Sequence, residues 1–341
     1  MKLLNSLVAV SCITVSVFAA DALIKQAKDA GLEPIPTKQK DLMKIIDSDS
    51  NKITPAKVEL GKKLYFDPRL SKSNLISCNT CHNLALAGAD LVPAAIGHKW
   101  TANPSHLNSP TVYNAVFAKS QFWDGRDPHL EAQAQGPIQA MPEMAASKEL
   151  IEQRINSIPE YVNEFKKIYG KESKIDLKLV ADTIAVFEKT LTTPSRFDDY
   201  LNGNEKALTK DEKEGLKVFI DKGCATCHNG IALGGTMQPF EVAGKYKHAE
   251  LGGFKGNKDG HIKVPTLRNI LETAPYYHNG AIWDIKEAIA EMGKIQLGVE
   301  LNEKEVNAIA TFFNSLTGTK PKIEYPILPA STAATPKPEA N

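Results

Sequence analysis

The 341-residue chain is poor in cysteine, shows few strand-like segments and carries no excess of either charge. Its 41 basic side chains nearly balance 40 acidic ones, so nothing suggests nucleic acid as a partner. After Ala19 no apolar run is long enough to cross a bilayer as a helix. The sequence therefore indicates a helical, soluble protein, and its chemistry has to be sought in a few motifs.

Four of the five cysteines lie in two Cys-x-x-Cys-His pentapeptides, Cys78–His82 and Cys224–His228. This pattern is typical of haem c attachment, in which two thiols bond to the haem vinyl groups and the histidine reaches the iron. Two short disulfides are one alternative, but a histidine follows each second cysteine. A four-cysteine zinc site is another, but the motifs are too far apart for a zinc ribbon. The pattern predicts two covalent haem c groups and a redox function.

The N-terminus resembles an export signal. Lys2 precedes an apolar stretch from Leu3 to Ala19, which ends in the small-x-small pattern Val17-Phe18-Ala19. Cys12 offers an alternative as a lipoprotein cysteine, but the apolar run continues past it and no leucine stands three residues before it. We expect a signal peptide over residues 1–19, cleaved near Ala19 or Ala20, and a periplasmic protein.

An internal repeat precedes the two haem motifs. Gly, Lys and Asp recur in register in Gly61–Asp67 and Gly215–Asp221, with apolar residues between them. Both segments resemble the first helix of a cytochrome c domain. Helix-start signals come before each of them, Thr54 with Pro55 in one copy and Thr209 with Glu212 in the other.

A second amphipathic helix is predicted well downstream of each haem motif. Asn302, with Glu305 three residues later, is the expected cap of the later one. The apolar faces are Val180, Ile184, Phe187 and Leu191 in the first half and Val306, Ile309, Ala310, Phe313 and Leu316 in the second. An early helix packed on a late one is the core of a cytochrome c domain. The predicted fold is mainly α, with two cytochrome c-like domains, each around one covalent haem c.

The domain boundaries follow from these repeats. We expect a first domain over residues 20–194, a second over 195–318 and a C-terminal extension over 319–341, with Thr193-Pro194-Ser195 as the linker. Residues 329–341 are rich in Pro, Ala and Thr, which predicts disorder. For residues 321–329 the sequence allows packing back onto the first domain.

The sixth iron ligand decides what each haem does. Methionine opposite histidine raises the reduction potential and suits a haem that relays electrons. A haem with a displaceable sixth ligand can instead bind peroxide. A protein with one haem of each kind would be an enzyme, whereas two closed haems would make an electron carrier.

At this point a family resemblance becomes specific, and it covers nearly the whole chain after the signal. The chain resembles the bacterial diheme cytochrome c peroxidases, which are related to the methylamine-utilisation diheme enzymes. The segments that carry the resemblance are Ile96–Trp100, Asn108–Thr111, Gln121–Arg126, Gln133, Gly136-Pro137, Glu143, Val264–Asn269, Ala274–Gly280 and Met292-Gly293.

The resemblance implies two unequal haems. The peroxidatic haem would be attached at Cys78 and Cys81, with His82 and a removable His98 on its iron. The electron-transferring haem would be attached at Cys224 and Cys227, with His228 and Met292 on its iron. A packing role is the alternative for His98. Met237, Met141 and Met144 compete with Met292, but Met237 follows His228 too closely for the chain to pass round the haem edge.

The resemblance also implies catalytic residues. Glu143 and Gln133 would lie over the open face of the peroxidatic haem, Glu143 moving a proton between the peroxide oxygens and Gln133 holding peroxide by hydrogen bonding. Solvated surface roles are the alternative for both. Trp123 would lie between the haems on the electron route, for which ordinary interdomain packing is the alternative.

Other implied features are a calcium ion and a homodimer. Asn108, Thr273 and Pro275 would bind one Ca²⁺ between the domains through an amide oxygen and backbone carbonyls. His278 would line the electron-transferring haem. No ligand role is assigned to His106, His129, His248 or His261.

The sequence hypothesis is a periplasmic peroxidase that reduces hydrogen peroxide to water with electrons from a small cytochrome c or cupredoxin. A non-catalytic diheme electron carrier is one alternative. A diheme enzyme that oxidises a partner protein is the other. Those enzymes have a tyrosine in place of the sixth-ligand methionine, so Met292 weighs against it.

Overall fold

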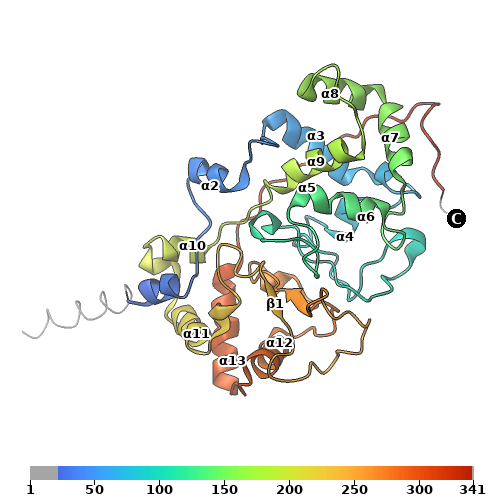
Figure 1. Cartoon of the computed structure of the whole chain (residues 1–341). Coiled ribbons are helices and arrows are strands. Elements are labelled where there is room, and N and C mark those ends of the chain that lie inside the picture. The colour runs from blue at the N-terminus through green and yellow to red at the C-terminus, as the bar shows by residue number, and fades with distance from the viewer. Residues whose placement is uncertain (1–21, 340–341) are drawn as a thin grey trace, which may run out of the picture.

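The computed structural model describes residues 22–339, so the predicted signal peptide, residues 1–19, lies outside the described residues. The described chain is mostly helical, and its sheet is one antiparallel pair, β1 (Met237–Pro239) and β2 (His261–Lys263), with Met237 opposite Lys263. Figure 1 shows two lobes, the first half of the chain forming one and the second half the other. The predicted fold class is confirmed.

Helices of the first half follow the chain from an N-terminal helix over residues 22–29. They are α2 (Gln39–Ile46), α3 (Pro55–Phe66), α4 (Cys78–Cys81), α5 (Leu130–Gln133), α6 (Gln135–Gln139), α7 (Lys148–Asn156), α8 (Pro159–Tyr169) and α9 (Leu177–Glu188). Those of the second half are α10 (Arg196–Leu201), α11 (Lys210–Asp221), α12 (Ile285–Met292) and α13 (Glu303–Phe313). A π-helical turn over Gly293–Leu297 extends α12, and no described helix is long and apolar enough to span a membrane.

The same pair of helices builds each lobe, α3 on α9 in the first and α11 on α13 in the second. The repeated glycine marks each crossing. A Cβ on Gly61 would lie 2.2 Å from the carbonyl oxygen of Thr183, and one on Gly215 would lie 2.0 Å from that of Ala308. Only glycine permits such a close backbone approach, which explains why it recurs in register.

The predicted helix starts are confirmed. Pro55 is the first residue of α3, and the Thr54 hydroxyl accepts a hydrogen bond from the Lys57 backbone N–H. Capping boxes begin α11 at Thr209 and α13 at Asn302. Each cap gives an otherwise unpaired backbone N–H a partner, so the sequence fixes where these core helices begin.

The N-terminal segment belongs to the second lobe, whereas the sequence analysis assigned residues 20–194 to the first. Ile24 and Leu32 are buried in the second apolar core. The Ile35 backbone N–H donates to Asp198 Oδ1 at 2.8 Å, beside α10. Apolar side chains of the N-terminal helix thus complete a core formed far along the chain. Figure 1 shows this helix beside α10 and α11.

The C-terminal segment crosses to the first lobe and packs against it through residue 339, whereas the sequence analysis expected disorder over residues 329–341. Arg69 Nη1 donates to the Pro329 carbonyl at 2.8 Å, and Arg154 Nη2 donates to the Lys337 carbonyl at 3.0 Å. Tyr325 packs edge-on against Phe66. Buried guanidinium groups need acceptors, and the backbone carbonyls of the extended segment supply them. Residues 340–341 lie outside the described range.

Candidate functional site

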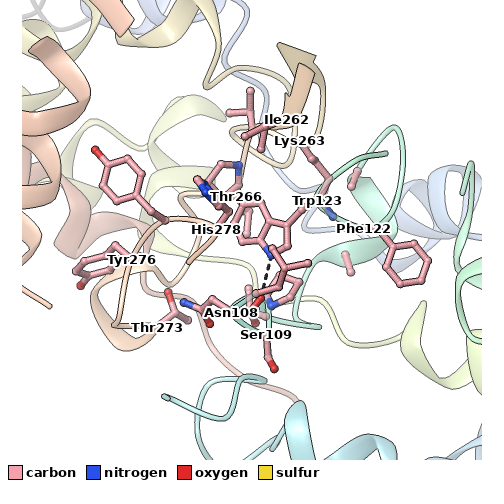
Figure 2. Close-up of a pocket in the computed structure, with 18 of the residues that line it drawn as sticks. Asn108, Ser109, Phe122, Trp123, Ile262, Lys263, Thr266, Thr273, Tyr276 and His278 are labelled. Carbon is pink, nitrogen blue, oxygen red and sulfur yellow. Dashed lines mark hydrogen bonds between the residues drawn. The ribbon is translucent and has the colours of Figure 1, made fainter. Parts of the chain in front are cut away.

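A cavity of about 380 Å³ lies where the two lobes meet and is lined by both Cys-x-x-Cys-His motifs. Figure 2 shows its middle, around Trp123. The predicted attachment and histidine residues on its wall are Cys78, Cys81, His82, Cys224, Cys227 and His228. The fold therefore brings together two motifs that are widely separated in sequence.

The four described cysteines are free thiols, which excludes the alternative of two short disulfides. Burial raises the pKa of Cys81 to about 12 and that of Cys224 to about 11. Both thiols are therefore neutral when no metal is bound. They remain suited to thioether formation with a haem vinyl group, so the cysteines fit haem c.

Each motif histidine is oriented by a backbone carbonyl. His82 Nδ1 lies 2.9 Å from the Pro110 oxygen, and His228 Nδ1 lies 3.2 Å from the Leu233 oxygen. This contact places the proton on Nδ1 and leaves the Nε2 lone pair free for iron. Burial lowers the pKa of His82 and lowers that of His228 to about 4, so both rings are neutral. The histidines also fit haem c.

Met292, the last residue of α12, lines the cavity with His228. Of its competitors, Met144 also lines the cavity but is packed in the first core. Met141 is 66% exposed, and Met237 is not among the described lining residues. Met292 is therefore the methionine that can serve the second haem, and its ligand role stays a prediction.

Glu143 and Gln133 are both half-buried and line the same cavity as the first motif, and their catalytic roles stay predictions. Burial raises the pKa of Glu143, although the charge of Arg126 opposes this. Arg126 stacks on Phe122, with its guanidinium 3.4 Å from the ring centroid, and both also line the cavity. A carboxyl group with a raised pKa in a cavity can exchange protons with a bound ligand.

His98 is buried but is not among the described residues that line the cavity. Its Nδ1 has no hydrogen-bond partner among the described residues. Its backbone N–H donates to the Glu143 carbonyl at 2.7 Å, and a Cβ on Gly97 would lie 2.0 Å from the Pro142 oxygen. The segment carrying His98 is thus tied to the segment carrying Glu143, and here Glu143 faces the cavity.

Trp123 is buried at the centre of the cavity, where residues of both lobes meet. Its indole Nε1–H donates to the Asn108 carbonyl at 2.9 Å, the dashed line in Figure 2. His278, from the second lobe, packs edge-on against it with ring centroids 6.3 Å apart. Burial lowers the pKa of His278 to about 4, so its ring is neutral. Trp123 therefore joins the two lobes through a ring contact, and its place on an electron route stays a prediction.

The predicted calcium residues also meet at the cavity wall. The Asn108 Nδ2–H donates to the Pro275 carbonyl at 2.6 Å, and Thr273 is beside them (Figure 2). No group of three or more His, Cys, Asp or Glu side chains capable of holding a metal occurs in residues 22–339. Amide and carbonyl oxygens fit calcium, which prefers hard oxygen ligands.

Two buried ionisable residues on the cavity wall were not found from the sequence. Glu188, at the end of α9, has its pKa raised to about 8 by burial, and its Oε2 has no hydrogen-bond partner among the described residues. Lys263, at the end of β2, is also buried on the wall. Only their places in the sequence could have drawn attention to these two residues. Glu188 follows the apolar face of a predicted helix, and Lys263 directly precedes the Val264–Asn269 motif.

Two lobes with cytochrome c-like helix pairs, each presenting cysteines and a neutral histidine to a shared cavity, define a two-haem c-type redox protein. Residues 55–206 match the family described as Di-haem cytochrome c peroxidase, and residues 212–317 match the family Cytochrome c. The chain belongs to the di-haem cytochrome c peroxidase family, carries two haem c groups and is an oxidoreductase.

Similar proteins cover almost the whole chain. Cytochrome c551 peroxidase of Pseudomonas aeruginosa is 47% identical over 94% of this chain and 93% of that protein. Cytochrome c551 peroxidase of Nitrosomonas europaea is 45% identical over 82% of this chain and 85% of that protein. Among solved structures, a MauG-like protein associated with microbial copper homeostasis shares 25% identity with a TM-score of 0.70, over 80% of this chain and 92% of that one.

Proposed function

We propose that this enzyme reduces hydrogen peroxide to two waters, using two protons and two electrons from a small cytochrome c or cupredoxin in the periplasm. One observation carries the proposal. Glu143 and Gln133 line the cavity that also holds the first haem motif, while His228 and Met292 line it beside the second. The names of the similar peroxidases support the same substrate.

Each haem iron supplies the redox chemistry when bound, and the protein's own residues control the protons and the geometry. Glu143, as a carboxylate, accepts a proton from the near peroxide oxygen and returns it to the departing oxygen. Gln133 holds the oxidant by hydrogen bonding through its amide. His82 is held in one orientation by the Pro110 carbonyl.

Electrons enter at the Met292 side and pass toward the first motif through Trp123. The indole is fixed by its hydrogen bond to Asn108 and by its contact with His278. Close packing of rings between the two sites gives a short, rigid route. This arrangement needs no large movement of Trp123 for each electron.

The proposal includes a switch between two states of the first site. Because the His98 N–H is bonded to the Glu143 carbonyl and Gly97 touches Pro142, moving His98 to the iron must also move Glu143. A state with His98 on the iron would thus withdraw the proton-transfer group. An electron on the second haem would favour the state in which Glu143 faces the cavity.

An absorption and electron-spin-resonance titration tests the function. The holoprotein is examined oxidised, half-reduced with calcium, and then with peroxide. A high-spin signal that is consumed by peroxide supports the peroxidase. A protein with two low-spin haems at every redox level, and no peroxide turnover, is an electron carrier instead.

Met292→His should lower the reduction potential of the second haem. Imidazole donates more strongly than a thioether and favours ferric iron. We expect a fall of at least about 59 mV, a tenfold change in the one-electron equilibrium. Potentiometric titration measures it, with Met141→His as the matched control because Met141 is 66% exposed. Equal second-haem potentials in the unmodified protein and both variants would show that Met292 is not the ligand.

We also propose one Ca²⁺ at Asn108, Thr273 and Pro275. Asn108→Leu keeps the size of the side chain but removes its oxygen, so calcium binding measured by calorimetry should be lost. Asn314→Leu, on an exposed asparagine, is the control and should bind calcium as before. Undiminished binding by Asn108→Leu would place the ion elsewhere.

Export and assembly are further parts of the proposal. Cell fractionation should find the mature protein in the periplasm without residues 1–19. Sedimentation of the holoprotein should give the mass of a homodimer. A cytoplasmic, uncleaved chain would contradict the signal peptide, and a monomer at all concentrations would contradict the dimer.

A further inference from the structure

Lys263 is a buried cation without a counter-ion. Its side chain is among the buried groups, with the residue 8% exposed. Within residues 22–339, no hydrogen bond or ion pair is formed by its ammonium group. Burial lowers its pKa to about 8, and the charge of Asp124 only partly offsets this. A buried ammonium is costly unless an anion or several acceptors meet it.

Lys263 lies on the cavity wall. The Lys263 backbone N–H donates to the Trp123 carbonyl at 2.8 Å, so the end of β2 is attached to the centre of the cavity. Figure 2 shows Lys263 beside Trp123. Lys263 belongs to the second lobe, yet Trp123 belongs to the first.

The strand pair that carries Lys263 packs against the first lobe. Met237, opposite Lys263 in this pair, lies so close to Gly125 that a Cβ there would be 2.4 Å from its Sδ. Together with the hydrogen bond from Lys263 to Trp123, this contact places Lys263 against the loop of the first lobe that lines the cavity. Lys263 therefore lies across the lobe boundary, on the side of the first haem motif.

Within residues 22–339, Asp124 is the anion whose charge acts on Lys263. Asp124 is engaged by Arg126, with Nη1 and Oδ1 2.9 Å apart. Haem c, however, carries two propionate carboxylates on the edge opposite its thioether bonds. A carboxylate arriving with the haem would satisfy the ammonium and would itself be neutralised within the cavity.

We propose that the Lys263 ammonium binds a propionate of the haem attached at Cys78 and Cys81, so that a residue of the second lobe both anchors and electrostatically tunes the first haem. A nearby cation favours the reduced, less positive iron. Removing it leaves an unpaired propionate, which favours ferric iron. The reduction potential of the first haem thus depends on Lys263.

The test is a potentiometric titration of both haems in the absence of peroxide. Lys263→Met keeps the length of the side chain without its charge. The one-electron reduction equilibrium constant of the first haem should fall about tenfold, which lowers its reduction potential by about 59 mV. Lys263→Arg should keep the potential near that of the unmodified protein. Lys258→Met, on an exposed lysine, is the matched control and should change neither haem.

The outcomes separate this inference from the peroxidase proposal, because no turnover is measured. An unchanged first-haem potential in Lys263→Met overturns the inference, and so does a shift confined to the second haem. If Lys263→Met fails to retain haem, resonance Raman spectra of Lys263→Arg decide. A guanidinium in place of an ammonium should shift a propionate bending band, and unchanged bands overturn the contact.

Discussion

Replacing Glu143 by glutamine is expected to lower kcat/KM for hydrogen peroxide by about two to four orders of magnitude. Glutamine fills the same space and can still donate a hydrogen bond, but it cannot accept a proton from peroxide. Glu143 lines the cavity of the first motif, where the oxidant would bind. Stopped-flow reduction of peroxide by the pre-reduced enzyme measures the loss.

The pH dependence provides a second sign of the same role. Burial raises the pKa of Glu143 above that of an exposed glutamate. The reactive carboxylate is therefore present above this raised pKa and is lost as the pH falls through it. The acid limb of kcat/KM should lie at higher pH than for an exposed glutamate, and Glu143→Gln should remove that limb.

A matched variant makes the result interpretable. Glu172 is exposed in the first lobe, and Glu172→Gln should retain the activity and pH profile of the unmodified enzyme. Both variants should keep the haem content of the unmodified protein, and Glu172→Gln should also keep its reduction potentials. Peroxide turnover by Glu143→Gln at the rate of Glu172→Gln would refute the proton-transfer role.

Local sequence signals predicted the two lobes because their geometry is local. Pro55 and the capping boxes at Thr209 and Asn302 begin the core helices where expected. The repeated glycines, Gly61 and Gly215, lie at the helix crossings because a side chain would clash with the backbone there. Each Cys-x-x-Cys-His motif also fixes its own chemistry within five residues.

Features that depend on distant contacts could not be predicted in this way. The N-terminal helix carries Ile24 into the second core, and nothing in its own pattern says which core it completes. Residues 329–339 have a disorder-prone composition, yet Arg69 and Arg154 bind their carbonyls. A backbone acceptor has no sequence signature, so only the fold reveals it.

Some cavity residues could be predicted from the sequence and others could not. Glu143, Gln133 and Trp123 were placed through family resemblance, and the structure brings all three to one cavity. Lys263 carries no motif of its own. Its importance comes from lacking a partner, which is a property of its surroundings and not of the sequence.

Replacing Arg268 by methionine is expected to reduce the free energy of unfolding by about 3–5 kcal/mol. Arg268 and Asp198 form a fully buried ion pair, both side chains being 0% exposed. Two guanidinium nitrogens bind both carboxylate oxygens, at 2.8 and 3.1 Å. Methionine fills much of the volume but leaves a buried carboxylate without its counter-ion. Urea unfolding of the holoprotein, followed by circular dichroism, measures the change.

The loss of unfolding free energy depends on the other hydrogen bonds that Asp198 accepts. It also accepts hydrogen bonds from the backbone N–H groups of Ile35 and Ser195, so it joins the N-terminal segment to the start of α10. These donors stabilise the remaining charge only in part. Lys217→Met is the control, because the Lys217 and Asp221 side chains are 55% and 42% exposed and their pairing should be worth about 1 kcal/mol or less. Equal losses in the two variants would mean that water reaches Asp198 and that the pair does not tie the N-terminal segment to the second lobe.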